Sequence, residues 1–308
     1  MRRVARSFGF AVGLAWLFAG CAPREVPPQP DARPAVLRIG YTPSEEAVSD
    51  RTAANRALAR YLERTLPGLK VVLVRTPSYG PAVEAMTRGE IDLMGLPPFA
   101  YVLAGQPSPV EAIAVTGTAR SGPRTYQSAL IAHRRAGVAR LEDLPATARK
   151  LRFNFADPAS NSGHLVPLAR LAEIGLVTER DFGASEFTLS HSVSVFNVAF
   201  GRAEVAGVNL SVLQRLIAKG RVQRDEIVTL WTSDPLPNGP IAVRRSLPPA
   251  FKRELQQALV GLAAADPAAS REVMEQYTEP SLVFLPCDDS LYDGLRALAA
   301  RVNAGAAR

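Results

Sequence analysis

Short aliphatic runs alternate along the chain with segments in which apolar residues recur at helical spacing. VLRIG (36–40) and KVVLVR (70–75) are typical of buried strands, and the apolar residues from Leu58 to Leu66 recur every three or four positions. Strand-like and helical segments continue to alternate in this way toward the end of the chain. This order predicts an α/β fold with mixed, mostly parallel sheets flanked by helices.

One short sequence pattern occurs twice in the chain. RGEID (88–92) and FGRAE (200–204) each end a helical segment with a glycine followed by an acidic residue, and each leads into a strand-like run. A glycine after the last helical turn is a common helix stop. We therefore expect two lobes built on related βα plans.

Two long strand-like runs, 125–133 and the proline-interrupted 227–243, are the segments that we expect to cross between the lobes. The first lobe is then predicted to combine residues 36–127 with 234–308, and the second to comprise residues 128–233. Two crossovers of this kind form a hinge on which lobes can close around a ligand. We expect three helices to cover the first lobe: 248–264, 268–277 and 290–302.

The start of the chain has the features of an export signal. Three arginines precede the apolar stretch Phe8–Ala19, which is too short to span a bilayer. The following LFAGC resembles the lipobox of bacterial lipoproteins, with Phe18 as a looser match. The resemblance implies that residues 1–20 are a signal peptide and that Cys21 carries a lipid, which anchors the protein at the periplasmic face of a bacterial membrane. Residues 21–35 are proline-rich and predict an extended tether; an ordinary signal peptide with an incidental cysteine is the alternative.

The composition of the chain argues against several classes of function. The formal net charge is +7, and three of the arginines lie in residues 1–20, so the mature chain has a smaller excess. Lysine and arginine form no basic cluster interleaved with aromatic residues, which argues against a nucleic-acid partner. His133, His164 and His191 lack the spacing of a metal site, and no nucleophile–base pair stands out. We expect no metal, no cofactor and no catalytic activity.

The sequence DPASNSGHLVP (157–167) joins a predicted strand to a predicted helix, with Ser160 at or beside the N-cap. The first N–H groups of a helix lack internal partners, and its dipole adds about half a positive charge there. The hydroxyls of Ser160 and Ser162 and the amide of Asn161 add donors, and Gly163 lets a ligand approach the backbone. The stretch predicts a neutral oxyanion site. A well-capped helix with surface serines is the structural alternative.

Further polar residues stand near predicted strand ends or crossovers: Tyr79, Tyr126, His191 and Asn209. In open α/β sheets, ligands bind beyond the carboxyl ends of the strands. We expect these residues to face the same cleft as the serines, although each has a plain alternative as a helix staple, a core edge, a cap or a turn.

Three stretches carry a resemblance to a known family: EAMTRGEIDLMGLPPFAYVLA, DPASNSGHLVP and WTSDPLPNGPIAVRRSLP. Their order and spacing resemble the periplasmic phosphonate/phosphite-type solute-binding proteins of ABC transporters over residues 36–290. The resemblance implies a periplasmic-binding-protein type II fold, with two lobes joined by a two-crossover hinge.

The resemblance also implies roles for individual residues. In that family, the serines of the Asp-Pro-x-Ser-x-Ser-Gly run and the residue between them bind the oxyanion of the ligand. The matching residues of this chain are Ser160, Asn161 and Ser162, with backbone or imidazole contacts expected from Gly163 and His164. Positions that line the same cleft in the family match Tyr79, Tyr126 and His191.

Three positions depart from the relatives that take up aminoalkyl phosphonates. Ser192 stands where an acidic residue often follows the histidine, Asn209 stands where aspartate is common, and Leu96 stands where some relatives have an aromatic residue. The missing acids remove the partners of a ligand ammonium group, which is costly to bury unpaired. We expect a small ligand without an amine, such as phosphite, methylphosphonate or hypophosphite. A sulfur or arsenic oxyanion is the alternative.

The family resemblance further implies a partner at the membrane. We expect a monomeric binding protein that delivers its ligand to an ABC permease. A ligand-presenting subunit for a membrane sensor kinase is the alternative, because both partners would meet the same ligand-closed form.

Overall fold

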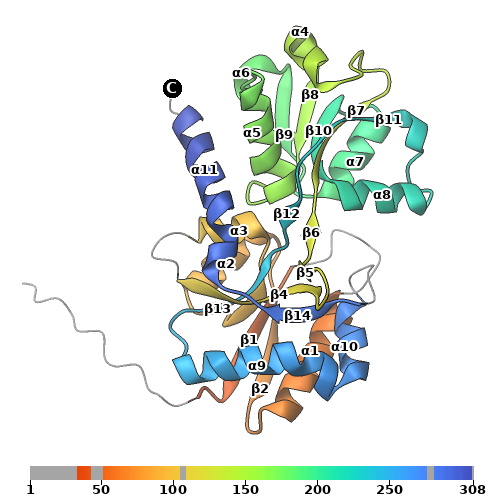
Figure 1. The fold of residues 1–308 in the computed structure, drawn as a ribbon. Helices are drawn as coiled ribbons and strands as arrows, with labels where there is room; N and C mark the ends of the chain where they lie inside the picture. The colour runs from red at the N-terminus through yellow and green to blue at the C-terminus, as the bar shows by residue number, and fades with distance from the viewer. Residues whose placement is uncertain (1–32, 43–50, 105–108, 276–280, 307–308) are drawn as a thin grey trace, which may run out of the picture.

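The protein folds into two lobes, one at each end of the molecule (Figure 1). The computed structural model describes residues 33–42, 51–104, 109–275 and 281–306. The expectations for the signal peptide, for Cys21 and for most of the tether fall outside the described residues. Each lobe is a sheet flanked by helices, so the predicted two-lobed α/β class is confirmed.

The first sheet is seven-stranded in the described part of the chain, in the order β14-β4-β13-β3-β1-β2, with β5 paired to β4. Leu37, Leu62 and Phe251 are buried between this sheet and its helices, and Leu62 belongs to the apolar spacing that predicted the first helix. The strands are β1 (Val36–Tyr41), β2 (Lys70–Arg75), β3 (Leu93–Gly95), β4 (Val110–Thr118), β5 (Gly122–Pro123), β13 (Pro240–Arg244) and β14 (Val283–Pro286). The helices are α1 (Arg51–Thr65), α2 (Tyr79–Thr87), α3 (Pro98–Leu103), α9 (Pro249–Ala265), α10 (Pro267–Met274), the 3₁₀ turn Asp289–Tyr292 and α11 (Asp293–Ala306).

The second sheet is five-stranded in the described residues, in the order β11-β7-β10-β8-β9. Phe153, Leu171 and Val205 are fully buried in its core. The strands are β7 (Ser128–His133), β8 (Arg152–Phe155), β9 (Ala184–Phe187), β10 (Val205–Asn209) and β11 (Ile227–Thr232). The helices are α4 (Leu144–Thr147), α5 (Val166–Glu173), α6 (Thr178–Asp181), α7 (His191–Ala199) and α8 (Leu210–Ala218), with short turns at Leu141–Asp143, Ala148–Lys150, Asn161–Leu165 (η3) and Arg224–Glu226.

Both sheets are mixed, but parallel pairs are not the majority that the sequence predicted. In the first sheet β1 is parallel to β2 and β3, whereas β13, β14 and β5 run antiparallel to their neighbours. In the second sheet β8 is parallel to β9 and β10, and β7 is antiparallel to β10 and β11. The reason is the crossing of the chain, because a strand that leaves for or returns from the other lobe runs against the strands of the local βα units.

Two short strands connect the lobes in the middle of the molecule (Figure 1). β6 (Thr125–Tyr126) leads into the second lobe and β12 (Leu236–Pro237) leads back, and the two pair antiparallel with Leu236 opposite Tyr126. All described strands on one side of this hinge end before residue 124 or begin after residue 239, and all those on the other lie within 128–232. We call residues 36–127 with 234–308 lobe 1 and residues 128–233 lobe 2.

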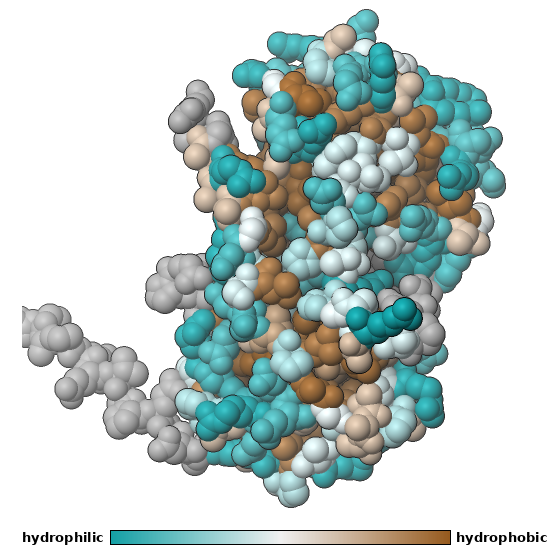
Figure 2. All heavy atoms as spheres, viewed as in Figure 1, coloured by the Kyte–Doolittle hydropathy of each residue, from teal (hydrophilic) through white to brown (hydrophobic). Residues whose placement is uncertain are grey.

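The last helix corrects the expectation that all C-terminal helices cover lobe 1. α9 and α10 do pack on lobe 1, but α11 runs on beside lobe 2 and packs against α5 (Figure 1). Leu295 and Ala299 of α11 share one buried cluster with Phe99 of α3 and Leu165 of η3. Hydrophobic residues of lobe 2 border α11 in the space-filling view (Figure 2). The C-terminal helix therefore makes an apolar contact between the lobes in addition to the hinge.

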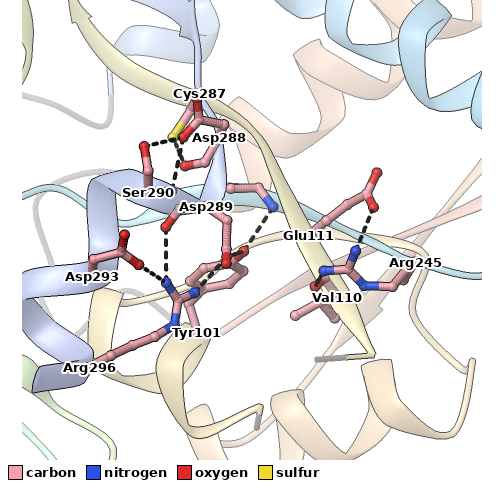
Figure 3. A network of polar contacts seen from close by, with 11 residues as sticks. Tyr101, Val110, Glu111, Arg245, Cys287, Asp288, Asp289, Ser290, Asp293 and Arg296 are labelled. Atoms are coloured by element: carbon pink, nitrogen blue, oxygen red, sulfur yellow. Dashed lines mark hydrogen bonds and ion pairs between the residues drawn. The ribbon is translucent and has the colours of Figure 1, made fainter. Parts of the chain in front are cut away.

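A network of polar contacts fixes the start of α11 to lobe 1 (Figure 3). The buried Tyr101 of α3 donates its hydroxyl to Asp289, which also accepts from Arg296 of α11. Arg296 bonds Asp293 at 2.8 Å, and its guanidinium lies 5.9 Å from the centre of the Tyr101 ring. The N–H of Ala112 in β4 donates to the Tyr101 hydroxyl at 3.1 Å. The first turn of α11 is thus attached to the sheet of lobe 1 through α3.

Candidate functional site

A cavity of about 210 Å³ lies between the lobes, and residues of both lobes and of the hinge form its wall. Seven of the nine residues singled out from the sequence line it: Tyr79, Tyr126, Ser160, Asn161, Ser162, His191 and Asn209. Gly163 and His164 do not line it. A cavity of this size is small for a ligand pocket, which suits a ligand of a few heavy atoms.

The described wall of the cavity has many polar groups but no carboxylate, ammonium or guanidinium group. Its polar groups are hydroxyls, amides, backbone groups and the imidazole of His191, and no Asp, Glu, Lys or Arg of the described residues lines it. An anion in such a place is stabilised by oriented dipoles, as it is at the N-terminus of a helix. Asn209 and Leu96 are both in the wall, so two of the three departures noted in the sequence lie at the site itself, whereas Ser192 does not line the cavity.

The helix of the serine-rich stretch starts with one wide π-helical turn, Asn161–Leu165, and continues as α5. Pro167 has no N–H, so the carbonyl of Gly163 lacks the donor that an α-helix would give it. That carbonyl accepts the N–H of Ala156 at 3.0 Å instead. The proline therefore ties the start of the helix to the end of β8, and single π-turns of this kind are frequent at functional sites.

Ser160 is oriented by two neighbouring groups, the N–H of Gly163 and the ring of His191. Its Oγ caps the helix by accepting the N–H of Gly163 at 3.0 Å. Nδ1 of His191 accepts the N–H of Asn209 at 3.1 Å, so the neutral ring carries its proton on Nε2, which lies 3.3 Å from the same Oγ. Because both acceptor positions of Oγ are filled, the hydroxyl proton of Ser160 is left for an acceptor in the cavity.

Tyr126 of the hinge contacts the same helix start. Nδ2 of Asn161 donates to the Tyr126 hydroxyl at 3.1 Å, and the Ser162 side chain hydrogen-bonds the same phenol. Burial raises the pKa of Tyr126 to about 12, although these two hydrogen bonds oppose the rise. The phenol is therefore a neutral donor at physiological pH. The Ser162 carbonyl accepts the Ser128 hydroxyl at 2.7 Å, which fixes the backbone of the turn to β7.

The structure corrects the expected role of Gly163. Its N–H is already bonded to Ser160, and a Cβ on Gly163 would lie 2.6 Å from Cε1 of His191 and 2.5 Å from Cβ of Ala156. Such distances are far below van der Waals contact, so no side chain fits there. Gly163 makes room for the imidazole of His191, and its own contact is with the protein.

The structure also moves His164 away from the cavity. Its ring centre lies 5.0 Å from that of Phe155 and 4.9 Å from that of Phe187, and its Nδ1 is 2.7 Å from the carbonyl oxygen of Pro158. Burial lowers the pKa of His164, because the charged ring would lose its hydration among these aromatic groups. His164 packs behind the helix start and offers no imidazole to the cavity.

Five polar residues of the cavity wall were not singled out from the sequence: Tyr41, Thr42, Asn55, Thr116 and Asn238. Asn238 follows the hinge strand β12, and its Nδ2 donates to Oγ1 of Thr116 at 2.7 Å. Its carbonyl accepts the hydroxyl of the buried Tyr292 at 2.9 Å. At Gly239 a Cβ would lie 1.9 Å from the carbonyl oxygen of Leu96, so the backbone passes in close contact. The available signal was the Asn-Gly pair between two prolines, which marks a tight turn at the second crossover.

Among the residues that the structure describes, no group of three or more His, Cys, Asp or Glu side chains is arranged to hold a metal ion. Among the described lining residues of the cavity, His191 is the one imidazole, with no thiol or carboxylate beside it. None of the described helices has the length and apolar character needed to cross a bilayer.

Two sheets, a two-strand hinge and a polar cavity lined from both lobes define the class of two-lobed solute-binding proteins. Within that class, the chain belongs to the ABC transporter phosphonate periplasmic substrate-binding protein family, whose sequence model matches residues 39–292. The family expected from the three sequence stretches is thereby confirmed. It is a family of substrate-binding transport components of the periplasm, and not of catalysts.

Individual relatives agree with this membership. The chain is 29% identical over 304 residues to the phosphate-import protein PhnD of Mycolicibacterium smegmatis, which covers 93% of this chain and 92% of the relative. It resembles the binding protein component of an ABC phosphonate transporter from Pseudomonas aeruginosa, with a TM-score of 0.74, 24% identity and coverage of 88% and 87% of the two chains. PhnD1 from Prochlorococcus marinus in complex with methylphosphonate matches with a TM-score of 0.70, 15% identity and coverage of 87% and 98%. These likenesses confirm the type II binding-protein fold.

Proposed function

We propose that the chain binds a small phosphorus oxyanion without an amine, such as phosphite, methylphosphonate or hypophosphite, and delivers it to the permease of an ABC importer. The observation that carries the proposal is the cavity wall, where hydroxyl and amide groups gather and no described residue is Asp, Glu, Lys or Arg. Such a wall suits a compact anion that is recognised by its oxygens and protons. The methylphosphonate bound to PhnD1 of Prochlorococcus marinus is a ligand of this kind.

The proposed cycle begins at the helix start of lobe 2. The helix dipole and the directed hydroxyl protons of Ser160 and Tyr126 attract the anion, and Ser162 adds a further hydroxyl. Tyr79, the first residue of α2, faces the cavity from lobe 1. Closure about β6 and β12 removes water, which strengthens each hydrogen bond to the anion in the lower dielectric.

The same wall disfavours an aminoalkyl phosphonate. Its ammonium group would need a carboxylate, and the described lining residues include none. Asn209 stands where an aspartate is common, and its Oδ1 is already bonded to the N–H of Ser211 at 2.9 Å. A buried ammonium without a partner loses its hydration without compensation.

Inorganic phosphate is a second candidate ligand, favoured by the 29% identity with the phosphate-import protein of Mycolicibacterium smegmatis. Phosphate carries an extra hydroxyl where phosphite has hydrogen and methylphosphonate has a methyl group. The wall also has apolar parts, among them Ile39, Leu96 and Ile241. A hydroxyl buried against such a surface without a partner costs about 1–3 kcal/mol, which is roughly a tenfold to hundredfold loss of affinity. We therefore place phosphate after phosphite and methylphosphonate.

Isothermal titration with matched ligands tests the proposal. Ethylphosphonate and 2-aminoethylphosphonate differ by the amine, and we expect the former to bind at least about tenfold more tightly. Methylphosphonate, phosphite, phosphate, arsenate and methanesulfonate complete the series, and each true ligand should raise the melting temperature with its concentration. A preference for the aminated ligand would overturn the exclusion of amines. Failure to bind any phosphorus oxyanion would overturn the function.

We also propose that a lipid on Cys21 tethers the protein to the membrane and that an ABC permease, rather than a sensor kinase, receives the ligand. The LFAGC sequence and the proline-rich segment after it support the anchor, and the family supports the permease. Cys21→Ser should then release the chain from the membrane fraction of the expressing cells. Retention of the variant in that fraction would contradict the anchor.

A further inference from the structure

Asn161 has an acceptor that the protein leaves unused. The residue is 1% exposed, and its Oδ1 is buried with no hydrogen-bond partner among the described residues. Its Nδ2 donates one of its two N–H groups to the Tyr126 hydroxyl at 3.1 Å. Buried carbonyl oxygens nearly always receive a hydrogen bond, so an unpaired one calls for a partner from outside the protein.

The position of Asn161 shows where that partner would come from. Asn161 lines the interlobe cavity between Ser160 and Ser162 and beside Tyr126. The sequence suggested that its amide is a donor to the ligand, but the atom that has no partner within the described protein is the amide oxygen. The wall therefore offers hydroxyl protons and one amide oxygen to the same small space.

We propose that Asn161 is a specificity-determining residue that accepts a proton from the ligand, so that the site selects a singly protonated phosphorus oxyanion over an anion without such a proton. The inference rests on the proposed function and adds the protonation state of the ligand to it. The unprotonated oxygens accept from the hydroxyls of Ser160 and Tyr126, and the P–OH group donates to Oδ1 of Asn161.

Two anions of similar shape can distinguish a site that accepts a proton from the ligand from a site that only binds negative charge. Methylphosphonate and methanesulfonate have the same tetrahedral shape and three oxygens each. The phosphonate monoanion keeps one proton near neutral pH, since second ionisations of phosphoryl groups lie near neutrality, as for a phosphate monoester at about 6. The sulfonate has no proton, so it would place an oxygen lone pair against the unpaired oxygen of Asn161.

Because the ligand itself loses a proton as pH rises, its affinity should depend on pH. The effect of titratable protein groups near the cavity must be measured separately. His191 and Tyr126 face Asn161 from α7 and the hinge, and Tyr79 faces the cavity from lobe 1. Asp157 lies in the turn before the helix, where it accepts the N–H of Ala159 at 2.7 Å. Methanesulfonate does not change its own protonation in this range, so its affinity reports any titration of these protein groups.

The experiment is isothermal titration of the purified chain with both ligands from pH 5.5 to pH 8.5. At the acid end, methylphosphonate should bind about tenfold to a hundredfold more tightly than methanesulfonate. As pH rises above the second pKa of the phosphonate, its affinity should fall by about tenfold per pH unit relative to methanesulfonate. The wild-type protein alone decides this part, so no variant has to fold.

Two variants test whether Asn161 causes the preference for methylphosphonate over methanesulfonate. Asn161→Leu should bring the affinities of the two ligands to within about threefold of each other. Asn209→Ala is the matched control, because it removes another amide of the cavity wall whose oxygen is already bonded to Ser211, and it should leave the ratio unchanged.

The possible results test the role of Asn161 separately from the proposed binding of a phosphorus oxyanion. Tight binding of methylphosphonate with equal binding of methanesulfonate, or a preference that survives in Asn161→Leu, would overturn the role of Asn161 and leave the proposed function standing. Absence of binding by methylphosphonate, phosphite and phosphate would overturn both.

Discussion

Ser160 and Ser162 stand two positions apart, but their side chains have different hydrogen-bond partners. Ser160 caps the helix and receives the His191 ring, so it belongs to the local fold as well as to the cavity. Ser162 contributes its carbonyl to the fold, and its hydroxyl reaches Tyr126 at the cavity wall. Substitution of the two serines should therefore separate stability from binding.

We expect Ser162→Ala to weaken binding of methylphosphonate by roughly tenfold to a hundredfold, because the Tyr126 phenol loses one of the two hydrogen bonds that direct its own proton to the anion. Its ligand-free melting temperature should stay close to that of the wild type, since the backbone contact with Ser128 remains. Ser160→Ala should lose affinity and also about 1 kcal/mol of stability, because the cap to Gly163 is removed. Titration calorimetry and thermal unfolding measure the two effects. A Ser162→Ala variant that unfolds early but binds normally would refute the division of roles.

The residue-level predictions from sequence held where the cause is local. A serine before a helix start and the strand–turn–helix order are written in adjacent residues, and Ser160 is the N-cap in the structure. The place of His164 depends on Phe155 and Phe187, which come from two different strands. The need for glycine at 163 depends on the ring of His191, on another helix. Contacts between segments that are distant in the sequence cannot be predicted from the local pattern of residues.

At the level of elements, apolar spacing located most strands and helices but not their neighbours. β4 (Val110–Thr118), next to both β13 and β14, was not singled out, since its short apolar run at 112–115 has no alternation and fits several structures. The majority of parallel pairs was wrong because the return of the chain through the hinge reverses strands. α11 was expected on lobe 1, but its apolar face meets α3 and the helix start of lobe 2.

The contact made by α11 should contribute measurably to stability. Leu295 is 7% exposed in the cluster that joins α11 to Phe99 and Leu165, so Leu295→Ala should lower the free energy of unfolding by about 2–3 kcal/mol. Leu103→Ala is the control, because Leu103 is 50% exposed on α3 and its loss should cost less than about 0.5 kcal/mol. Urea denaturation followed by circular dichroism compares them. Equal midpoints for the two variants would show that α11 does not pack against the lobes as described.

In the described part of the chain, the two large sheets belong to lobes that meet at the cavity. The strand–helix alternation and the two long runs predicted two lobes and a hinge, and the sheets and the pairing of β6 with β12 agree with that plan. The relative placement of the lobes could not come from the sequence, because it depends on the sum of contacts at the hinge and at α11. That placement brings Tyr79 of lobe 1 and the helix start of lobe 2 to the same cavity. The function of the protein therefore depends on what that cavity holds.

A crystal structure of the chain with methylphosphonate measures this most directly. We expect the phosphonate oxygens within about 3 Å of the hydroxyls of Ser160, Ser162 and Tyr126, with Tyr79 closing the site from lobe 1 and one oxygen facing Oδ1 of Asn161. A phosphonate bound elsewhere on the protein, or serines that face bulk solvent away from the ligand, would contradict the central claim that uncharged donors at this helix start hold the anion.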